Sequence, residues 1–209
     1  MTLKVVNLGL PKTGTTTLAK ALRRGGLHAA DHRILPHQTP VTELHGQFVA
    51  DLLYRGYYET GDPATYLPGF EALSEMSVLQ HSRSLWPQMD HGLIEAIRTH
   101  HPGVKFLASN RDSFKTSQSM LAWSDLGTSR LPATNAPGLP AGYGETTAQR
   151  VQWIEAHYAH MRAIFRGDPN FFEYDVAAPD ARDQISAFLG FDLPWWGKLN
   201  VNTLSEVVG

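Results

Sequence analysis

Short apolar runs alternate with helix-forming segments along most of the chain. The run at residues 3–8 is rich in β-branched side chains and nearly continuous in apolar character, which is typical of a buried parallel strand. A helix-forming run at 18–24 follows it and ends at Gly25 and Gly26. The pattern predicts further strands at 27–30, within 72–81 and most specifically at 77–81, at 104–109 and at 170–174, and helices at 42–57, from 87 to about 100, at 114–123, 146–165 and 180–189. Strands that alternate with helices in this way predict an α/β protein of three layers with a central parallel sheet.

The segment between Leu126 and Gly144 departs from this alternation. It is rich in glycine and proline and shows little periodicity. Long segments of this kind in compact domains are usually functional flaps or disordered. Because a chain of 209 residues matches one domain, we expect a single domain at 1–209 with a flap at about 126–144.

The composition excludes several classes of protein. The chain carries 18 Lys and Arg residues against 20 Asp and Glu, a balance that lacks the basic surface of nucleic-acid binders, so no nucleic-acid partner is expected. The hydrophobic fraction of 42% suffices for a folded core, and no stretch approaches the ~20 apolar residues that span a bilayer, so no membrane partner is expected. The absence of cysteine excludes disulfides, zinc thiolates and a cysteine nucleophile, and it agrees with a cytoplasmic location.

A loop with two glycines joins the first predicted strand to the first predicted helix. Backbone N–H groups and the positive end of the helix dipole can hold an anion there. Gly9 and Gly14 have the spacing of a Walker A loop, but Thr15 stands where that loop needs its lysine. The lysine lies earlier, at Lys12, and the glycine pattern of a Rossmann loop is absent. The loop therefore predicts phosphate binding through backbone and hydroxyl groups, with one ammonium near whatever leaves from that phosphate.

The run PKTGTT at residues 11–16 resembles, residue by residue, the 5′-phosphosulfate loop of the sulfotransferase family. The resemblance implies a P-loop NTPase-like fold that binds 3′-phosphoadenosine 5′-phosphosulfate (PAPS) at this loop. The donor contacts that it implies come from Lys12, Thr13, Gly14, Thr15, Thr16 and Thr17. Taken alone, the run is also compatible with a glycine- and threonine-rich turn that caps a helix.

A second motif follows the strand predicted at 104–109. Sulfotransferases carry an arginine in an R-[DN]-P run with a serine eight residues on, and this pair holds the 3′-phosphate of the donor; Arg111 and Ser119 have that spacing. A planar guanidinium binds a phosphate in bidentate fashion. Ser113 replaces the proline of the run, and the C-terminal tail lacks the Arg-Lys-Gly run with which cytosolic members contact the same phosphate. Without the first motif, Arg111 would fit a surface salt bridge better.

Together the two motifs imply a sulfotransferase that moves a sulfuryl group from PAPS to a hydroxyl or amine acceptor, releases adenosine 3′,5′-bisphosphate (PAP) and needs no metal. The acceptor is expected to be a small molecule or a carbohydrate, covered by the segment at 126–144 or by another subunit of a homo-oligomer. Two alternatives stay open. One is a P-loop kinase or nucleotidase that uses ATP and Mg²⁺, against which the missing Walker lysine weighs; the other is a nucleotide-binding module without a competent base.

The acceptor also needs a general base within hydrogen-bond reach. In open α/β sheets, ligands lie at the carboxyl ends of parallel strands. His81, at the end of the strand predicted at 77–81, is therefore the first candidate and Glu75 the second, while His32 also follows a predicted strand. Because the chain has ten histidines, His81 fits equally well a polar residue that merely ends a strand.

Overall fold

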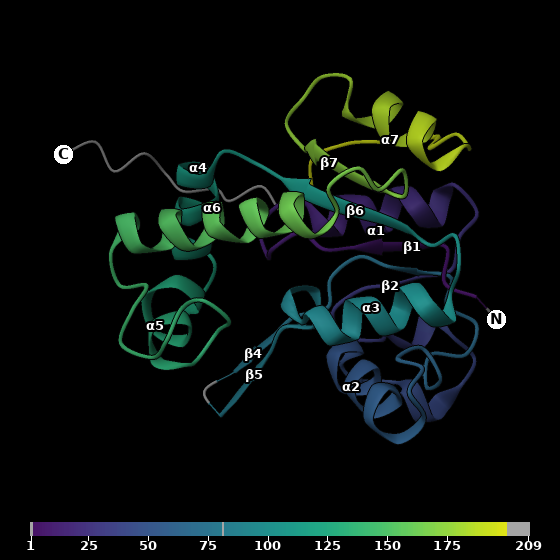
Figure 1. Ribbon diagram of the computed structural model, residues 1–209, viewed down its shortest axis with the longest axis horizontal. Helices are drawn as coiled ribbons and strands as arrows, with labels where there is room; N and C mark the ends of the chain where they lie inside the picture. Colours follow the sequence, from purple (N-terminus) through teal and green to yellow (C-terminus); the bar gives the residue numbers. More distant parts are fainter. Residues whose placement is uncertain (1, 81, 200–209) are drawn as a thin grey trace.

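The computed structural model describes residues 2–80 and 82–199, and its centre is a five-stranded parallel sheet in the order β2-β3-β1-β6-β7 (Figure 1). The strands are β1 (Val5–Asn7), β2 (Ala29–Ala30), β3 (Ala72–Leu73), β6 (Lys105–Asn110) and β7 (Phe171–Asp175). The central strand β1 pairs in parallel with β3 on one side and with β6 on the other. The predicted α/β architecture around a parallel sheet is confirmed.

Helices cover both faces of this sheet (Figure 1). They are α1 (Thr15–Arg24), α2 (Val49–Thr60), α3 (His91–His100), α4 (Ser113–Leu121), α5 (Leu131–Ala133), α6 (Thr147–Ile164) and α7 (Ala181–Leu189). Successive side chains of β1 point to opposite faces: Val5 belongs to a core cluster with residues of α1 and α7, and Val6 to one with residues of α2, α3 and α6. The sheet is therefore the middle of three layers, as predicted.

The segment at 126–144 contributes to a third core cluster. A π-helical turn at Leu126–Arg130 is followed directly by α5. Leu131 and Leu139 are among its buried side chains, and they share the cluster with Met120 of α4 and Trp153 of α6. The segment is thus more regular than the aperiodic loop that the sequence predicts, because its apolar side chains are buried in this cluster. Its role as a flap stays a prediction.

The prediction of a parallel strand at 77–81 is wrong. The third parallel strand is β3, at Ala72–Leu73, whereas β4 (Val78–Gln80) pairs antiparallel with β5 (Arg83–Leu85) in a separate hairpin. Val78 and Leu79 are buried outside the parallel sheet, so their apolar pattern resembles that of a sheet strand. The carboxyl end of the third parallel strand therefore leads to Glu75, two residues beyond Leu73.

The helix predicted at 42–57 begins later than expected. Thr42–Leu44 form one 3-10 turn, and α2 starts at Val49. Gly46 lies between them with φ +82°, a left-handed conformation that interrupts a right-handed helix. The turn at Thr42–Leu44 therefore does not continue into α2, which begins separately at Val49.

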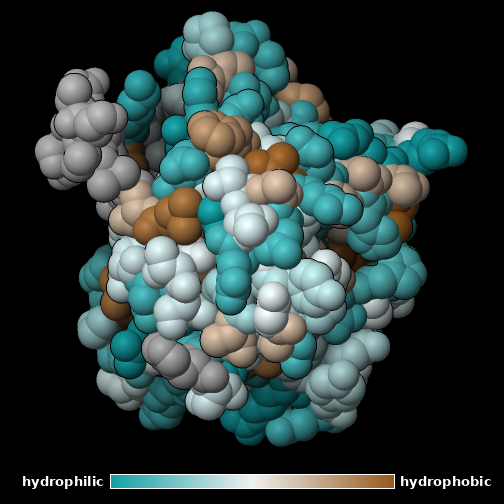
Figure 2. Space-filling model, turned by 90° about the vertical axis from the view of Figure 1, so that its left-hand side faces the viewer, coloured by the Kyte–Doolittle hydropathy of each residue, from teal (hydrophilic) through white to brown (hydrophobic). Residues whose placement is uncertain are grey.

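The face that carries α4, α5 and the start of α6 is mixed in character. Figure 2 shows mostly hydrophilic or neutral residues there, with small, separate hydrophobic patches. Phe114 and Trp123, on or next to α4, are 57% and 43% exposed. Within residues 2–80 and 82–199, no helix has both the length and the apolar character needed to cross a membrane.

Candidate functional site

The loop between β1 and α1 has a backbone that turns sharply twice. Lys12 has φ +73° and Gly14 has φ +86°, both in the left-handed region. A Cβ on Gly14 would lie 2.4 Å from a methyl group of Val176, so only glycine fits. In the described part of the chain no side chain caps α1 at Gly14. The positive end of the α1 dipole therefore faces this loop.

Asn7 connects the three central strands beneath this loop. Its Nδ2 donates to the Ser74 carbonyl at 2.9 Å and to Ser109 Oγ at 3.1 Å. Its Oδ1 accepts from the N–H groups of Ser109 at 3.0 Å and Gly9 at 3.3 Å. Because Asn7 is only 1% exposed, these bonds do not compete with water. The carboxyl ends of β1, β3 and β6 are thereby held together.

Thr13 shapes the loop from inside. Its Oγ1 donates to the Leu10 carbonyl at 2.6 Å and lies 2.9 Å from Ser109 Oγ. Its N–H points to the same carbonyl at 3.3 Å. Gly9 is required beside it, since a Cβ there would lie 2.0 Å from Ser109 Oγ. The polar groups of Thr13 are therefore used within the loop and set its curvature.

The three threonines that begin α1 differ in their surroundings. Ser74 Oγ donates to the carbonyl of Thr15 at 2.5 Å, which fixes the first turn to the end of β3. Thr17 Oγ1 donates to the carbonyl of Gly197 at 3.0 Å, so the C-terminal segment lies against α1. Thr15 and Thr17 are buried and Thr16 is half-buried. Thr16 is therefore the least buried residue of the three.

Three charged side chains from different strand ends influence one another around Lys12. Burial lowers the pKa of the Lys12 ammonium, the positive charge of Arg111 lowers it further, and the carboxylate of Glu75 raises it. Lys12 follows β1, Arg111 follows β6 and Glu75 follows β3, so the sheet brings them to one edge. Lys12 Nζ also lies 3.6 Å from the centre of the Trp123 ring, a cation–π contact.

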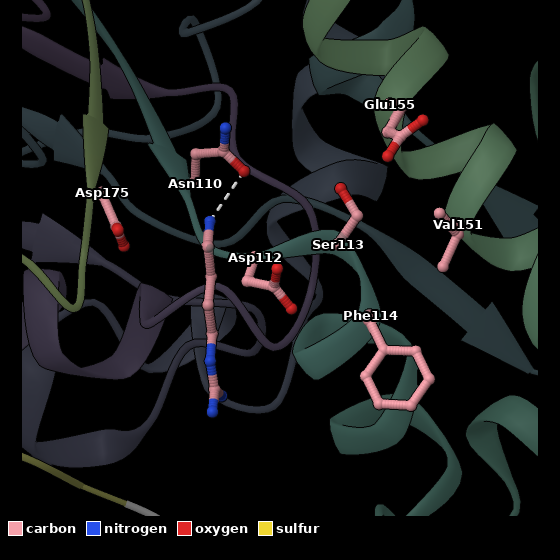
Figure 3. Close-up of a pocket in the computed structure, with 8 residues that line it drawn as sticks. Asn110, Asp112, Ser113, Phe114, Val151, Glu155 and Asp175 are labelled. Carbon is pink, nitrogen blue, oxygen red and sulfur yellow. Dashed lines mark hydrogen bonds between the residues drawn. The ribbon is translucent and has the colours of Figure 1, made fainter.

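Arg111 lines a cavity of about 360 Å³ at the end of β6. The other lining residues are Asn110, Asp112, Ser113, Phe114, Val151, Glu155 and Asp175. Figure 3 shows Ser113, Phe114, Val151 and Glu155 on one side of this cavity and Asn110 and Asp175 on the other. Among the described residues, the Arg111 guanidinium forms no ion pair. Three of the other residues that line this cavity, Asp112, Glu155 and Asp175, carry carboxyl groups.

Ser119 lies further along α4, the helix that begins after Arg111, and is half-buried. The buried Arg150 of α6 holds this helix: its Nε donates to Ser117 Oγ at 2.9 Å, and another of its nitrogens donates to the carbonyl of Gly144 at 2.7 Å. Asp112 caps α4, with its Oδ1 accepting from the N–H of Lys115 at 2.8 Å. The two residues of the second motif are thus on one firmly anchored unit.

Glu75 is the candidate base that the structure describes. Its side chain is 8% exposed, and its Oε1 accepts from the N–H of Ser77 at 3.0 Å and from Ser77 Oγ at 2.5 Å. Burial raises the pKa of the carboxyl, although the bonds to Ser77 and the charge of His32 act in the opposite direction. A carboxylate with a raised pKa is a stronger base at neutral pH.

The two histidines considered as bases have different outcomes. His81 lies outside the described residues, so its role stays a prediction. His32 follows β2 and its Nδ1 lies 2.9 Å from the carbonyl of Ser77, next to Glu75. His32 therefore belongs to the surroundings of Glu75.

Several residues that build the site were not identified from the sequence. Asn7, Ser74 and Ser109 form the hydrogen bonds that hold the strand ends together, and His157 and Tyr158 reach the same region from α6. Asn7 and Ser109 are polar residues within strongly apolar strands, and this signal could have marked them. Tyr158 gave no such signal because it lies on the apolar stripe of a helix, and His157 is one of ten histidines.

Comparisons with known proteins do not identify a function for this site. No family model matches the chain, and no curated protein matches it either. Among solved structures, the chain is similar to an unliganded sugar kinase from Janibacter sp. HTCC2649, with a TM-score of 0.46 and 15% identity over 91% of this chain and 95% of that one. A likeness this distant carries no argument about substrate or reaction, so function has to be argued from the site.

Proposed function

We propose that this protein is a sulfotransferase that moves a sulfuryl group from PAPS to a hydroxyl or amine acceptor. The observation that carries the proposal is the pairing of two cations at the open start of α1. Lys12 lies inside the loop before Gly14, and Arg111 is near enough to depress the pKa of Lys12. A donor with phosphates at both the 5′ and the 3′ position needs two such cations, and the resemblance of both motifs to the sulfotransferase family supports the same assignment.

The proposed reaction is an in-line displacement at sulfur. The acceptor oxygen or nitrogen forms the new bond to sulfur, the bond from sulfur to the 5′-phosphate oxygen breaks, and PAP leaves. Negative charge grows on that oxygen, where the Lys12 ammonium and the first-turn N–H groups of α1 stabilise it. Arg111 and Ser119 hold the 3′-phosphate and thereby orient the donor.

The acceptor proton goes to a general base, and we assign this role to Glu75. It follows β3 at the sheet edge that Lys12 and Arg111 share, and its raised pKa suits proton transfer near neutral pH. His81 is the rival base. The segment at 126–144, whose apolar residues pack beside α4 and α6, is proposed to cover the acceptor.

A second candidate is a kinase or nucleotidase that uses ATP and Mg²⁺. One observation favours it: Glu75 is a buried carboxylate next to the loop lysine, and Mg²⁺ is bound by one or two carboxylates together with substrate phosphates. Thr15 at the Walker lysine position weighs against it.

A thermal-shift experiment separates the two functions. Saturating PAP in the presence of EDTA is compared with ATP plus Mg²⁺, because a ligand that binds only the folded state stabilises it by RT ln(1 + [L]/Kd). Sulfotransferase function predicts stabilisation by PAP without metal that exceeds any effect of ATP and Mg²⁺. Stabilisation only by ATP and Mg²⁺ would support the kinase.

A further inference from the structure

We infer that His157 and Tyr158, neighbours on α6, are positioning residues that set the distance between the phosphate loop and the end of β6. The inference rests on the proposed function only in that this loop binds a phosphate. Both side chains are 2% exposed, and neither belongs to the loop or to the motifs that suggested a donor site. They bind the loop through its backbone.

Tyr158 bridges two chain segments with one hydroxyl group. Its O–H donates to the carbonyl of Ser109 at 2.7 Å, and its oxygen accepts from the N–H of Leu10 at 3.4 Å. Lys12 lies two residues after Leu10, and Arg111 lies two residues after Ser109. One buried hydroxyl therefore fixes the backbone positions from which the two cations extend.

His157 holds the start of the same loop. Its Nε2 lies 2.8 Å from the carbonyl of Leu8, and because a carbonyl only accepts, Nε2 carries the proton. Nδ1 is buried and has no hydrogen-bond partner in the described part of the chain. The ring is thus held neutral and in one tautomer, with its donor directed at the last residue before Gly9.

The packing explains why these hydrogen bonds from α6 are needed. The loop and the end of β6 approach so closely at Gly9 that a Cβ would lie 2.5 Å from the Ser109 carbonyl oxygen, which is the oxygen that Tyr158 binds. That carbonyl and the N–H of Leu10 lie where the parallel ladder between β1 and β6 has ended. Without Tyr158, two buried backbone groups lose a partner and the separation of the two segments is free to change.

The experiment compares four variants with the wild type. Tyr158→Phe removes the bridging hydroxyl alone. His157→Leu removes the donor to Leu8, and His157→Gln restores an N–H donor at similar reach. Trp153→Phe is the matched control: it lies on the same helix, is 3% exposed and loses one hydrogen bond, at 2.8 Å to the carbonyl of Pro137, which is not part of the phosphate loop.

Two quantities are measured for each variant. The first is amide hydrogen exchange of residues 8–17 in the protein without ligand, which reports local opening and needs no knowledge of the ligand. The second is the Kd for PAP from calorimetry. Loss of one neutral hydrogen bond predicts a rise in Kd of about 3- to 10-fold for His157→Leu, and the loss of two predicts at least as large a rise for Tyr158→Phe. Their loop exchange should be faster, with His157→Gln close to wild type.

The outcomes separate the inference from the proposed function. Tyr158→Phe and His157→Leu could instead match Trp153→Phe in both loop exchange and PAP affinity. That result would overturn the inference, because the changes would then reflect general destabilisation of the fold. If wild-type protein does not bind PAP, the proposed function fails. In that case the exchange rates alone decide whether the two residues position the loop.

Discussion

Lys12 Nζ lies 3.6 Å from the centre of the Trp123 indole, so the cation that is proposed to stabilise the leaving oxygen rests on a partly exposed aromatic ring. Cation–π contacts at exposed sites are worth about 0.5–1 kcal/mol, which a phosphate can easily exceed. We expect the ammonium to leave the ring when PAP binds.

Tryptophan fluorescence tests this relationship. PAP should change the emission of the wild type, because the charge over Trp123 moves. Trp123→Phe should lack most of that change although four other tryptophans remain, and Lys12→Ala, which has no ammonium to move, should lack it too. An equal change in all three proteins would contradict this prediction, because the signal would then not come from the contact between Lys12 and Trp123.

Lys12→Ala should abolish turnover and largely preserve affinity for the intact donor, PAPS. The reason is that charge on the leaving oxygen grows in the transition state, and an interaction made there contributes mainly to the rate. Turnover by stopped assay and PAPS affinity by calorimetry in the absence of acceptor are the two measurements. Unchanged turnover would exclude this role.

Arg111→Ala should weaken the binding of PAP more than the binding of adenosine 5′-phosphosulfate, which lacks the 3′-phosphate. A bidentate guanidinium contact to phosphate is charge-assisted, so a loss of about 10- to 100-fold in PAP affinity is expected. Arg166, exposed and just past the end of α6, offers a control of equal charge. Equal weakening of both nucleotides by Arg111→Ala would indicate a structural role.

Glu75→Gln should lower the rate by about 10²- to 10⁴-fold, the usual contribution of a general base, with PAP binding intact. The variant should also gain thermal stability relative to the wild type as pH rises. The carboxyl has a raised pKa in the folded state, so the folded protein binds its proton more tightly and loses stability as pH increases past the usual value of 4.5.

His81→Asn is the companion to this variant. If Glu75→Gln keeps near-full activity and His81→Asn loses it, the base is His81. If both variants stay active, the acceptor site has been placed wrongly.

The buried His157 predicts a second pH dependence, with the opposite sign. Burial depresses its pKa from 6.5 to about 4, so the unfolded state binds the proton more readily and the folded state loses stability as pH falls from 6.5 towards 4. At 1.36 kcal/mol per pKa unit, the loss approaches about 3 kcal/mol at the acid end. Denaturant unfolding between these pH values should show a smaller loss for His157→Gln; an identical loss would contradict the assignment.

The sequence predicted the features that depend on neighbouring residues and missed those that depend on contacts between distant parts of the chain. The end of α1 at Gly25, the strand ending near Asn110 and the helix expected at 146–165 follow from neighbouring residues. β3 was missed because it consists of two residues, Ala72–Leu73, and is shorter than any periodicity. The bond between Asn7 and Ser109 joins positions 102 residues apart, and only the folded chain reveals it.

Donor turnover in a mixed pool of phenols, alcohols, sugars and amines distinguishes sulfuryl transfer from phosphoryl transfer. Wild-type protein is incubated with PAPS in EDTA and, separately, with ATP and Mg²⁺, and PAP and ADP are quantified by anion-exchange chromatography. A sulfotransferase should release PAP in amounts that depend on the acceptor pool, and Lys12→Ala should release none. Intact PAPS together with acceptor-dependent ADP formation from ATP would contradict sulfotransferase function.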